Sequence, residues 1–394
     1  MFFEIIVALL FGVCFGIVTG LVPGVHVNLV SVLLLSASGF LLGYVSPLFL
    51  VVLIVAMAVT HTFLDAIPST FLGVPDADSA LCILPGQKLV LEGRGHEAVM
   101  LTVVGALGSL IIAFVCVPFL LPATRLVYPV LQPYIGWILL ILCILLIWKE
   151  QSMLWAAALF FLSGTLGLIV LHLPLEQALF PLFSGMFGVS SLLLSLRSSV
   201  NIPQQIRGDI ALDDAGRAIP VAVSIGWIAS FMPGLGPAQA ASLGCQLIKL
   251  RNRGYLILVG GLSTVNMALS LLTLYLFDKA RNGAVVVVQQ IFEIDNSSLW
   301  ILLFVSLAAG GVATLLTIFF SKVFSEWITR VHYKALCVTV IIFVSSLVLL
   351  ITGWLGLLVL LVSTSLGMIP EFKGIARSHL MGSLLIPVIL FFLF

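Results

Sequence analysis

A histidine and an aspartate stand four residues apart in the segment THTFLDAIPSTF, a spacing that puts His61 and Asp65 on one face of a helix. Asp65 is the first strong charge after Glu4, because no Asp, Glu, Lys or Arg lies between them. An ionisable side chain within so long an apolar run is costly and is a functional candidate by default. The pair could bind and release a proton or help hold a cation such as Na⁺. A neutral, hydrogen-bonded structural pair is the alternative.

Two Pro-Gly steps, Pro23-Gly24 and Pro233-Gly234, interrupt apolar runs at a spacing of 210 residues. Proline disrupts a helix and glycine permits a positive φ, so each step predicts a helix that stops and restarts. The backbone N–H groups at the new helix start favour an anion. Packing kinks are the alternative, but two breaks at matching positions favour a binding site. The candidate anion-binding residues are Pro23, Gly24, His26, Asn28, Ser69, Pro233, Gly234, Gly236, Gln239 and Asn266.

The segment Pro68–Gly86 is apolar but rich in proline and glycine, and it holds Asp76 and Asp78. We expect a re-entrant or broken element here, since irregular backbone at membrane depth must be buried in protein or face a water-filled cavity. Asp76 and Asp78 could join His61 and Asp65 in ion or proton coupling, or they could cap a short helix. No motif such as H-E-x-x-H and no serine paired with His61 and Asp65 indicates a metal site or an enzyme.

The composition identifies the environment of these residues. The chain has 394 residues, of which 61% are hydrophobic and 8% are charged, and its mean hydropathy is +1.28. A soluble domain carries about 25% charged residues, so this is an integral membrane protein. Because the apolar runs are long and continuous rather than alternating, we expect an all-α, polytopic bundle of about 10–14 membrane segments and not a β-barrel. A net charge of +1 without a basic stripe excludes a nucleic-acid partner.

The chain divides near its midpoint. Residues 1–196 form a first transmembrane repeat, 197–217 a polar linker, and 218–394 a second repeat. FGIVTGLVPGVHVNLVS in the first half aligns with IGWIASFMPGLGPAQAAS in the second, and DAIPS can be laid on NMALS, which pairs Asp65 with Asn266 and Ser69 with Ser270. We expect two related, inverted halves with broken helices in equivalent positions, the arrangement that marks a transporter's binding site.

Several charged segments are expected to have no role in binding or coupling. The cluster from Lys88 to Glu97 and the stretch Lys249–Arg253 read as solvated loops, and Lys373 and Arg377 as interface residues. The mixed stretch Ser321–Lys334 is typical of an interfacial amphipathic helix. Basic residues crowd into the second half, and the positive-inside rule places most of those loops in the cytoplasm.

Three stretches, GLVPGVHVN, DAIPSTFLGVPDADSALCILPG and RSHLMGSLLIPVIL, resemble the large permease subunit of the tripartite tricarboxylate transporters, and most closely its archaeal-type branch. The resemblance extends over nearly the whole chain. It implies a secondary transporter for carboxylates, driven by an ion gradient, that works with a small membrane subunit and an extracytoplasmic binding protein. His26 and Asn28 depart from the small residues that follow the first Pro-Gly in bacterial members.

These observations together predict a multi-pass permease of the plasma membrane, not an enzyme, that moves an anion of the carboxylate class by alternating access coupled to H⁺ or Na⁺. Apart from that coupling ion no cofactor or metal is expected. A homodimer is a further possible partnership. The alternative function is a translocase for polyprenyl-phosphate lipid carriers, whose phosphate would suit the same helix starts.

Overall fold

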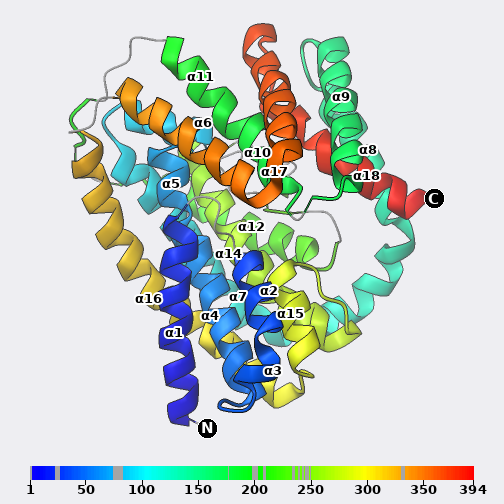
Figure 1. The fold of residues 1–394 in the computed structure, drawn as a ribbon. Coiled ribbons are helices and arrows are strands. Elements are labelled where there is room, and N and C mark those ends of the chain that lie inside the picture. The colour runs from blue at the N-terminus through cyan, green and yellow to red at the C-terminus, as the bar shows by residue number, and fades with distance from the viewer. Residues whose placement is uncertain are drawn as a thin grey trace.

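The computed structural model describes residues 2–22, 27–73, 83–175, 177–197, 203–206, 210–232, 236–237, 240–241, 244, 248, 250–329 and 333–394. In this part of the chain the structure consists of helices and their connections, without a β-strand, as expected (Figure 1).

The helices of the first half are α1 (Phe2–Leu21), α2 (Val27–Ser36), α3 (Ser38–Leu41), α4 (Pro47–Leu64), α5 (Ala66–Phe71), α6 (Ile83–Leu91), α7 (Gly95–Leu131), η2 (Gln132–Tyr134), α8 (Ile135–Trp148), α9 (Met153–His172), α10 (Leu179–Phe183), η3 (Ser184–Val189) and α11 (Ser190–Arg197). Those of the second half are α12 (Ala215–Phe231), α14 (Asn252–Phe277), α15 (Gly283–Ile291), α16 (Asn296–Ile328), α17 (Tyr333–Lys373), η4 (Arg377–Met381) and α18 (Gly382–Leu393).

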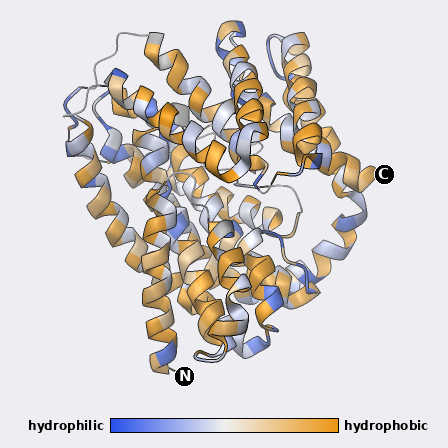
Figure 2. Cartoon of the chain, viewed as in Figure 1, coloured by the Kyte–Doolittle hydropathy of each residue, from blue (hydrophilic) through white to orange (hydrophobic). Residues whose placement is uncertain are grey.

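Seven of the described stretches are long and apolar enough to cross a membrane, and three shorter apolar stretches accompany them. Three of the seven contain a bend or a second helix, and one of them, Pro47–Phe71, comprises α4 and α5. A second joins α7 to α8, and the third lies in α17, in which Gly353 has a φ of 67° and separates two limbs. Apolar residues cover the long outer helices, whereas hydrophilic ones gather mainly near their ends (Figure 2). A multi-pass helical bundle is the arrangement that satisfies every backbone group in lipid.

The first half opens with a helical hairpin beside a third helix. The chain runs out along α1, returns through α2 and α3, and runs out again along α4. At the start, the Glu4 carboxylate accepts the backbone N–H of Ser46 at 3.3 Å and also the Ser46 hydroxyl. Further along, Gly12 faces the Leu53 carbonyl and Gly20 faces the Leu64 side chain. Helices α1 and α4 are therefore parallel neighbours (Figure 1).

The second half repeats this pattern. The Asp214 carboxylate, at the start of α12, accepts the backbone N–H of Arg251 at 3.2 Å, just before α14. Gly226 faces Val265, and the Thr273 hydroxyl donates to the Ser230 carbonyl at 3.1 Å, so α12 and α14 also run in parallel. The two carboxylates, Glu4 and Asp214, are 210 residues apart, which is the spacing of the Pro-Gly steps.

The two pairs of parallel helices run in opposite directions. Helix α16 is parallel to α4, because Phe63 lies beside Gly310 and Phe71 beside Phe324. Helix α7 is antiparallel to α16, because His96 bonds to Ser321 at 2.9 Å while Phe114 stacks on Trp300.

Helix α7 is in turn parallel to α14, since Glu97 bonds to Arg253 and Tyr128 stacks on Phe277. Helices α4 and α14 are therefore antiparallel, and they meet where the Thr62 and Thr264 hydroxyls lie 3.1 Å apart. This geometry is the one that an inverted repeat requires.

Besides these pairs within each half, the long helices of one half pack on helices of the other. Helix α7 packs on α14, and α16 packs on α4. The later helices of the first half also pack on helices of the second half. Gly167 on α9 meets the Ser383 carbonyl of α18, and Gly367 on α17 meets the Met186 carbonyl of η3. In both contacts glycine is needed for the backbones to approach so closely.

Two local expectations are corrected by the structure. The stretch Ser321–Lys334 is not a separate interfacial helix: α16 continues unbroken to Ile328, with Ser321 and Ser325 buried. The break in Pro68–Gly86 begins earlier than expected, at Asp65, which forms a turn between α4 and α5.

Candidate functional site

Eight predicted site residues lie outside the described part of the chain: Pro23, Gly24, His26, Asp76, Asp78, Pro233, Gly234 and Gln239. Their flanking elements are described. The first Pro-Gly step joins α1 to α2, and its α1 end lies beside the end of α4, where Gly20 faces Leu64. The second step follows α12. After it, the Gly236 carbonyl accepts the Ala240 N–H at 3.0 Å, as in a helical turn. The two steps therefore end parallel helix pairs that point in opposite directions.

His61 and Asp65 are both buried, with 5% and 6% of their surfaces exposed. The Asp65 backbone N–H donates to the His61 carbonyl at 3.0 Å, so both residues sit on the last turn of α4. The Ser69 hydroxyl donates to the Asp65 carbonyl at 2.7 Å. The structure thus brings these three predicted residues together, next to the helix end that leads into the first Pro-Gly step.

Asn28, just after the first Pro-Gly step, reaches the second half of the chain. A Cβ atom on Gly283 would lie 2.6 Å from the Asn28 carboxamide carbon, so this contact requires glycine at the start of α15. The neighbouring Asn282 caps α15 by accepting the Val285 N–H at 2.9 Å.

The Asn282 amide also donates to the Ser270 hydroxyl at 3.3 Å, and that hydroxyl donates to the Asn266 carbonyl. Asn28 therefore lies next to a hydrogen-bonded chain that runs from Asn282 through Ser270 to the Asn266 backbone carbonyl. Sequence analysis did not single out Asn282 and Gly283, although an Asn-Gly pair before an apolar run is a helix-start pattern.

Around Asp65, the helix contacts match residues of the two halves differently from the sequence alignment. Gly16 lies against Thr60, and Gly226, 210 residues later, lies against Val265. Thr60 thus corresponds to Val265, and Asp65, five residues later, corresponds to Ser270. The sequence alignment had placed Asn266 opposite Asp65, which is one helical turn away.

Charged residues of the segments that were expected to have no specific role form defined contacts. Glu97 is 4% exposed and forms ion pairs with both Arg94 and Arg253, the latter at 2.8 Å. Arg377, expected at an interface, is 8% exposed and donates to the Ser191 hydroxyl at 2.6 Å. Lys373 fits the interface expectation, because it is exposed and its ammonium lies 3.9 Å from the centre of the Trp155 ring.

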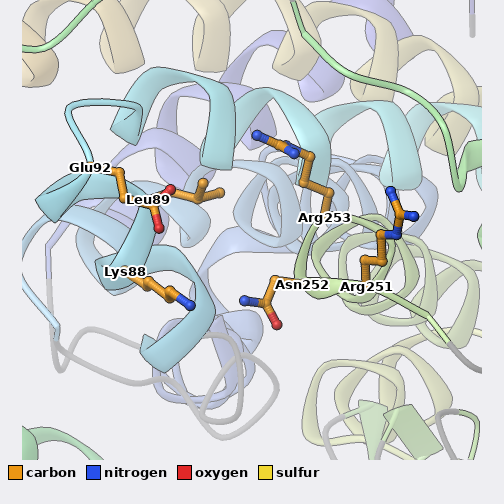
Figure 3. Close-up of a pocket in the computed structure, with 6 residues that line it drawn as sticks. All are labelled: Lys88, Leu89, Glu92, Arg251, Asn252 and Arg253. Atoms are coloured by element: carbon orange, nitrogen blue, oxygen red, sulfur yellow. The ribbon is translucent and has the colours of Figure 1, made fainter.

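A pocket of about 390 Å³ opens where the charged segment that begins at Lys88 meets residues 251–253 (Figure 3). Its lining comes from the end of α6 and the start of α14, and consists of Lys88, Leu89, Glu92, Arg251, Asn252 and Arg253. Sequence reasoning missed it, because the two charged stretches that form it are about 160 residues apart and each alone resembles a loop.

The sequence profile of the tripartite tricarboxylate transporter TctA family matches residues 6–382, which is nearly the whole chain. The chain belongs to the TctA family. It is also 28% identical over 399 residues to an uncharacterized protein of the archaeon Methanocaldococcus jannaschii, with 98% of each chain covered. No solved structure matches it.

TctA proteins are transporter permeases, so this chain is a multi-pass membrane protein of a transport system. The family name also describes a tripartite system, in which a TctA protein works with further components. The expected resemblance and the expected fold class are both confirmed.

Proposed function

We propose that this chain is a secondary permease for carboxylate anions, carrying its substrate across the plasma membrane by alternating access. The TctA match over residues 6–382 carries the proposal. The opposed helix pairs support it, because broken helices in inverted halves form the midplane sites of secondary transporters. We further propose that residues 1–196 and 218–394 are the two repeats, joined by the linker 197–217.

The substrate carboxylate would bind between the two Pro-Gly steps. Helix starts after such breaks present backbone N–H groups and a partial positive charge to an anion. The proposed contacts are Pro23, Gly24, His26, Asn28, Ser69, Pro233, Gly234, Gly236, Gln239 and Asn266. The contact of Asn28 with Gly283 supports this placement, since it brings Asn28 of the first half next to the start of α15, where Asn282 donates to Ser270 of α14.

Coupling to H⁺ or Na⁺ would use His61 and Asp65, with Asp76 and Asp78 as further candidates. Burial supports this role for the first two, because an ionisable side chain inside a membrane helix is costly unless it serves a function. The coupling ion would then bind on the last turn of α4, beside the helix end that leads into the first Pro-Gly step.

We also propose an orientation. The starts of α7 and α14 and the end of α16 lie together, since His96 bonds to Ser321 and Glu97 to Arg253. This end carries Lys88, Arg94, Arg251, Arg253 and Lys322, whereas Lys279 and Arg281 lie at the other end, beside Tyr128 of α7. The positive-inside rule then places the α7 start in the cytoplasm and the α1 start outside.

A small membrane subunit, an extracytoplasmic binding protein and a second copy of the chain are the proposed partners.

The test is uptake into proteoliposomes. The purified chain would be reconstituted and offered labelled citrate and smaller carboxylates, with an inward Na⁺ gradient, an inward H⁺ gradient or neither. We expect gradient-dependent uptake that falls at least tenfold in Asn28→Ala and persists in Asn296→Ala, an exposed position at the start of α16. Unchanged uptake in Asn28→Ala would remove that residue from the site. If no carboxylate is taken up, with or without accessory subunits, while a labelled polyprenyl phosphate is moved between leaflets, the lipid-carrier alternative replaces the proposal.

A further inference from the structure

The pocket between α6 and α14 is built from both halves of the chain. Lys88 and Glu92 come from the end of α6, and Arg251 and Arg253 from the start of α14. Figure 3 shows Lys88 and Asn252 pointing toward one another across the opening. Three cationic side chains thus face one carboxylate, and its volume of about 390 Å³ lies within the range of small-molecule sites, about 300–1,000 Å³.

The surrounding protein cancels only part of the pocket's positive charge. The buried Glu97 is shared by Arg94 and Arg253, so two guanidinium groups meet one carboxylate. Within the described residues, the Lys88 and Arg251 side chains have no ion-pair partner.

The start of the 26-residue helix α14 adds its partial positive charge. The Asp214 carboxylate accepts the Arg251 N–H there and offsets part of this charge, while the Arg251 side chain lines the pocket.

The inverted half shows that the fold does not need this charge. Helices α6 and α15 are both nine residues long, and each precedes the long helix of its half. Aligning α6 with α15 matches Lys88 with Val288 and Glu92 with Phe292. The equivalent contacts of Glu4 with Ser46 and of Asp214 with Arg251 match Arg251 and Arg253 with Ser46 and Leu48. The same architecture at the opposite end of the molecule is therefore built without a single cation at these positions.

We propose that this pocket binds a small, multiply charged anion through its carboxylate or phosphate groups, at one mouth of the permease. The site is separate from the one between the Pro-Gly steps, and it relies on the proposed function only for the identity of the anion. Bound there, the anion is concentrated at the protein's surface before or after its passage. Clefts lined by one sign of charge raise the local concentration and association rate of oppositely charged ligands.

The test compares two double variants of the full chain with equal loss of charge. Lys88→Gln/Arg251→Gln removes two exposed cations from the pocket. Lys149→Gln/Lys322→Gln removes two exposed cations that do not line it, which controls for net charge. Dissociation constants for citrate, sulfate and inorganic phosphate would be measured in detergent from the rise of the thermal midpoint with ligand concentration. Midpoints without ligand report whether each variant is folded.

We expect the pocket variant to weaken binding of at least one of the three anions tenfold or more at low salt, and the control to change it less than twofold. In proteoliposomes the pocket variant should raise KM and leave the maximal rate within twofold. Equal dissociation constants in wild type and pocket variant, or equal losses in both variants, would overturn the pocket. Carboxylate uptake that survives this result would leave the proposed function standing. Sulfate or phosphate binding that depends on the pocket, in a chain that moves no carboxylate, would instead keep the pocket and reject the proposed function.

Discussion

At the residue scale, the contact between Asn28 and Gly283 is the most sensitive point of the candidate site. A Cβ atom on Gly283 would lie 2.6 Å from the Asn28 carboxamide, so Gly283→Ala must displace that side chain or the start of α15. We expect uptake to fall at least tenfold while the protein remains folded. Gly311→Ala is the matched control, because a Cβ there meets nothing within 4 Å, and alanine stabilises a helix interior by up to about 1 kcal/mol over glycine. Equal uptake by both variants would remove Asn28 from the substrate site.

A second residue-scale prediction concerns Glu150, in the connection between α8 and α9. Burial raises the pKa of its carboxyl, but hydrogen bonds from His379, at 3.0 Å, and from the Ala376 N–H outweigh burial and leave that pKa below its usual 4.5. The carboxylate therefore contributes stability above its usual pKa, and this stability is lost as the pH falls through the lowered value.

Thermal midpoints of wild type and Glu150→Gln across this pH range check the prediction. We expect the variant to lose about 1 kcal/mol above pH 5, since exposure to solvent weakens the contact. The gap should close as the medium becomes more acidic. Glu371→Gln, an exposed carboxyl nearby in α17, is the control. A gap that is constant with pH would contradict the assignment of the lowered pKa to ionised Glu150.

At the element scale, the pairing of α1 with α4 depends on glycines spaced four residues apart. A Cβ on Gly16 would lie 2.5 Å from the Thr60 Cβ and 2.9 Å from the Met57 carbonyl. We expect Gly16→Val to separate the helices and to cost about 1–3 kcal/mol, as overpacking does. The thermal midpoint in detergent measures this. Gly39→Ala, where nothing lies within 4 Å, should leave it unchanged. An unaltered midpoint in Gly16→Val would show that the two helices do not pack this closely.

Most of the elements could be predicted from the sequence, because hydropathy and Pro/Gly punctuation determine where membrane helices begin and end. For example, Gly353 interrupts a long apolar stretch of the sequence, and it lies between the two limbs of α17. The break at Asp65 was missed, because Ala66 and Ile67 continue the apolar run. The crossed packing could not be predicted either, since hydropathy reports which faces are apolar but not which helix covers them.

At the scale of the whole molecule, the two ends of the bundle differ in charge, and we expect them to face opposite sides of the membrane. Asn252→Cys, at the start of α14, should react with a membrane-impermeant maleimide only from the cytoplasmic side. Ser297→Cys, at the start of α16, should react only from outside. Labelling of intact cells and of inverted vesicles measures both. The reverse pattern would invert the proposed orientation but keep the two ends distinct, whereas labelling of both from one side would contradict the fold.

The candidate site was only partly predictable at this scale. The spacing of 210 residues between the Pro-Gly steps indicated related halves, and Glu4 and Asp214 keep that spacing in equivalent contacts. His61 and Asp65 were expected on one helix face, and the structure places them and Ser69 close together because all three are near one another in sequence. The pocket and the roles of Asn282 and Gly283 were not predicted, because contacts between segments far apart in the chain leave no local pattern.

The crossed packing has a consequence for biogenesis. Helix α4 is buried almost along its whole length, and α16, which covers it at Phe63, contributes Gly310 only about 250 residues later in synthesis. At about 5–20 residues per second this corresponds to roughly 10–50 s. During that interval the newly inserted α4 faces lipid or the insertion machinery with His61 and Asp65 on its last turn. Helices of each half pack on the other, so we expect a chain that stalls between residues 197 and 217 to expose these surfaces and to be a target for membrane quality control.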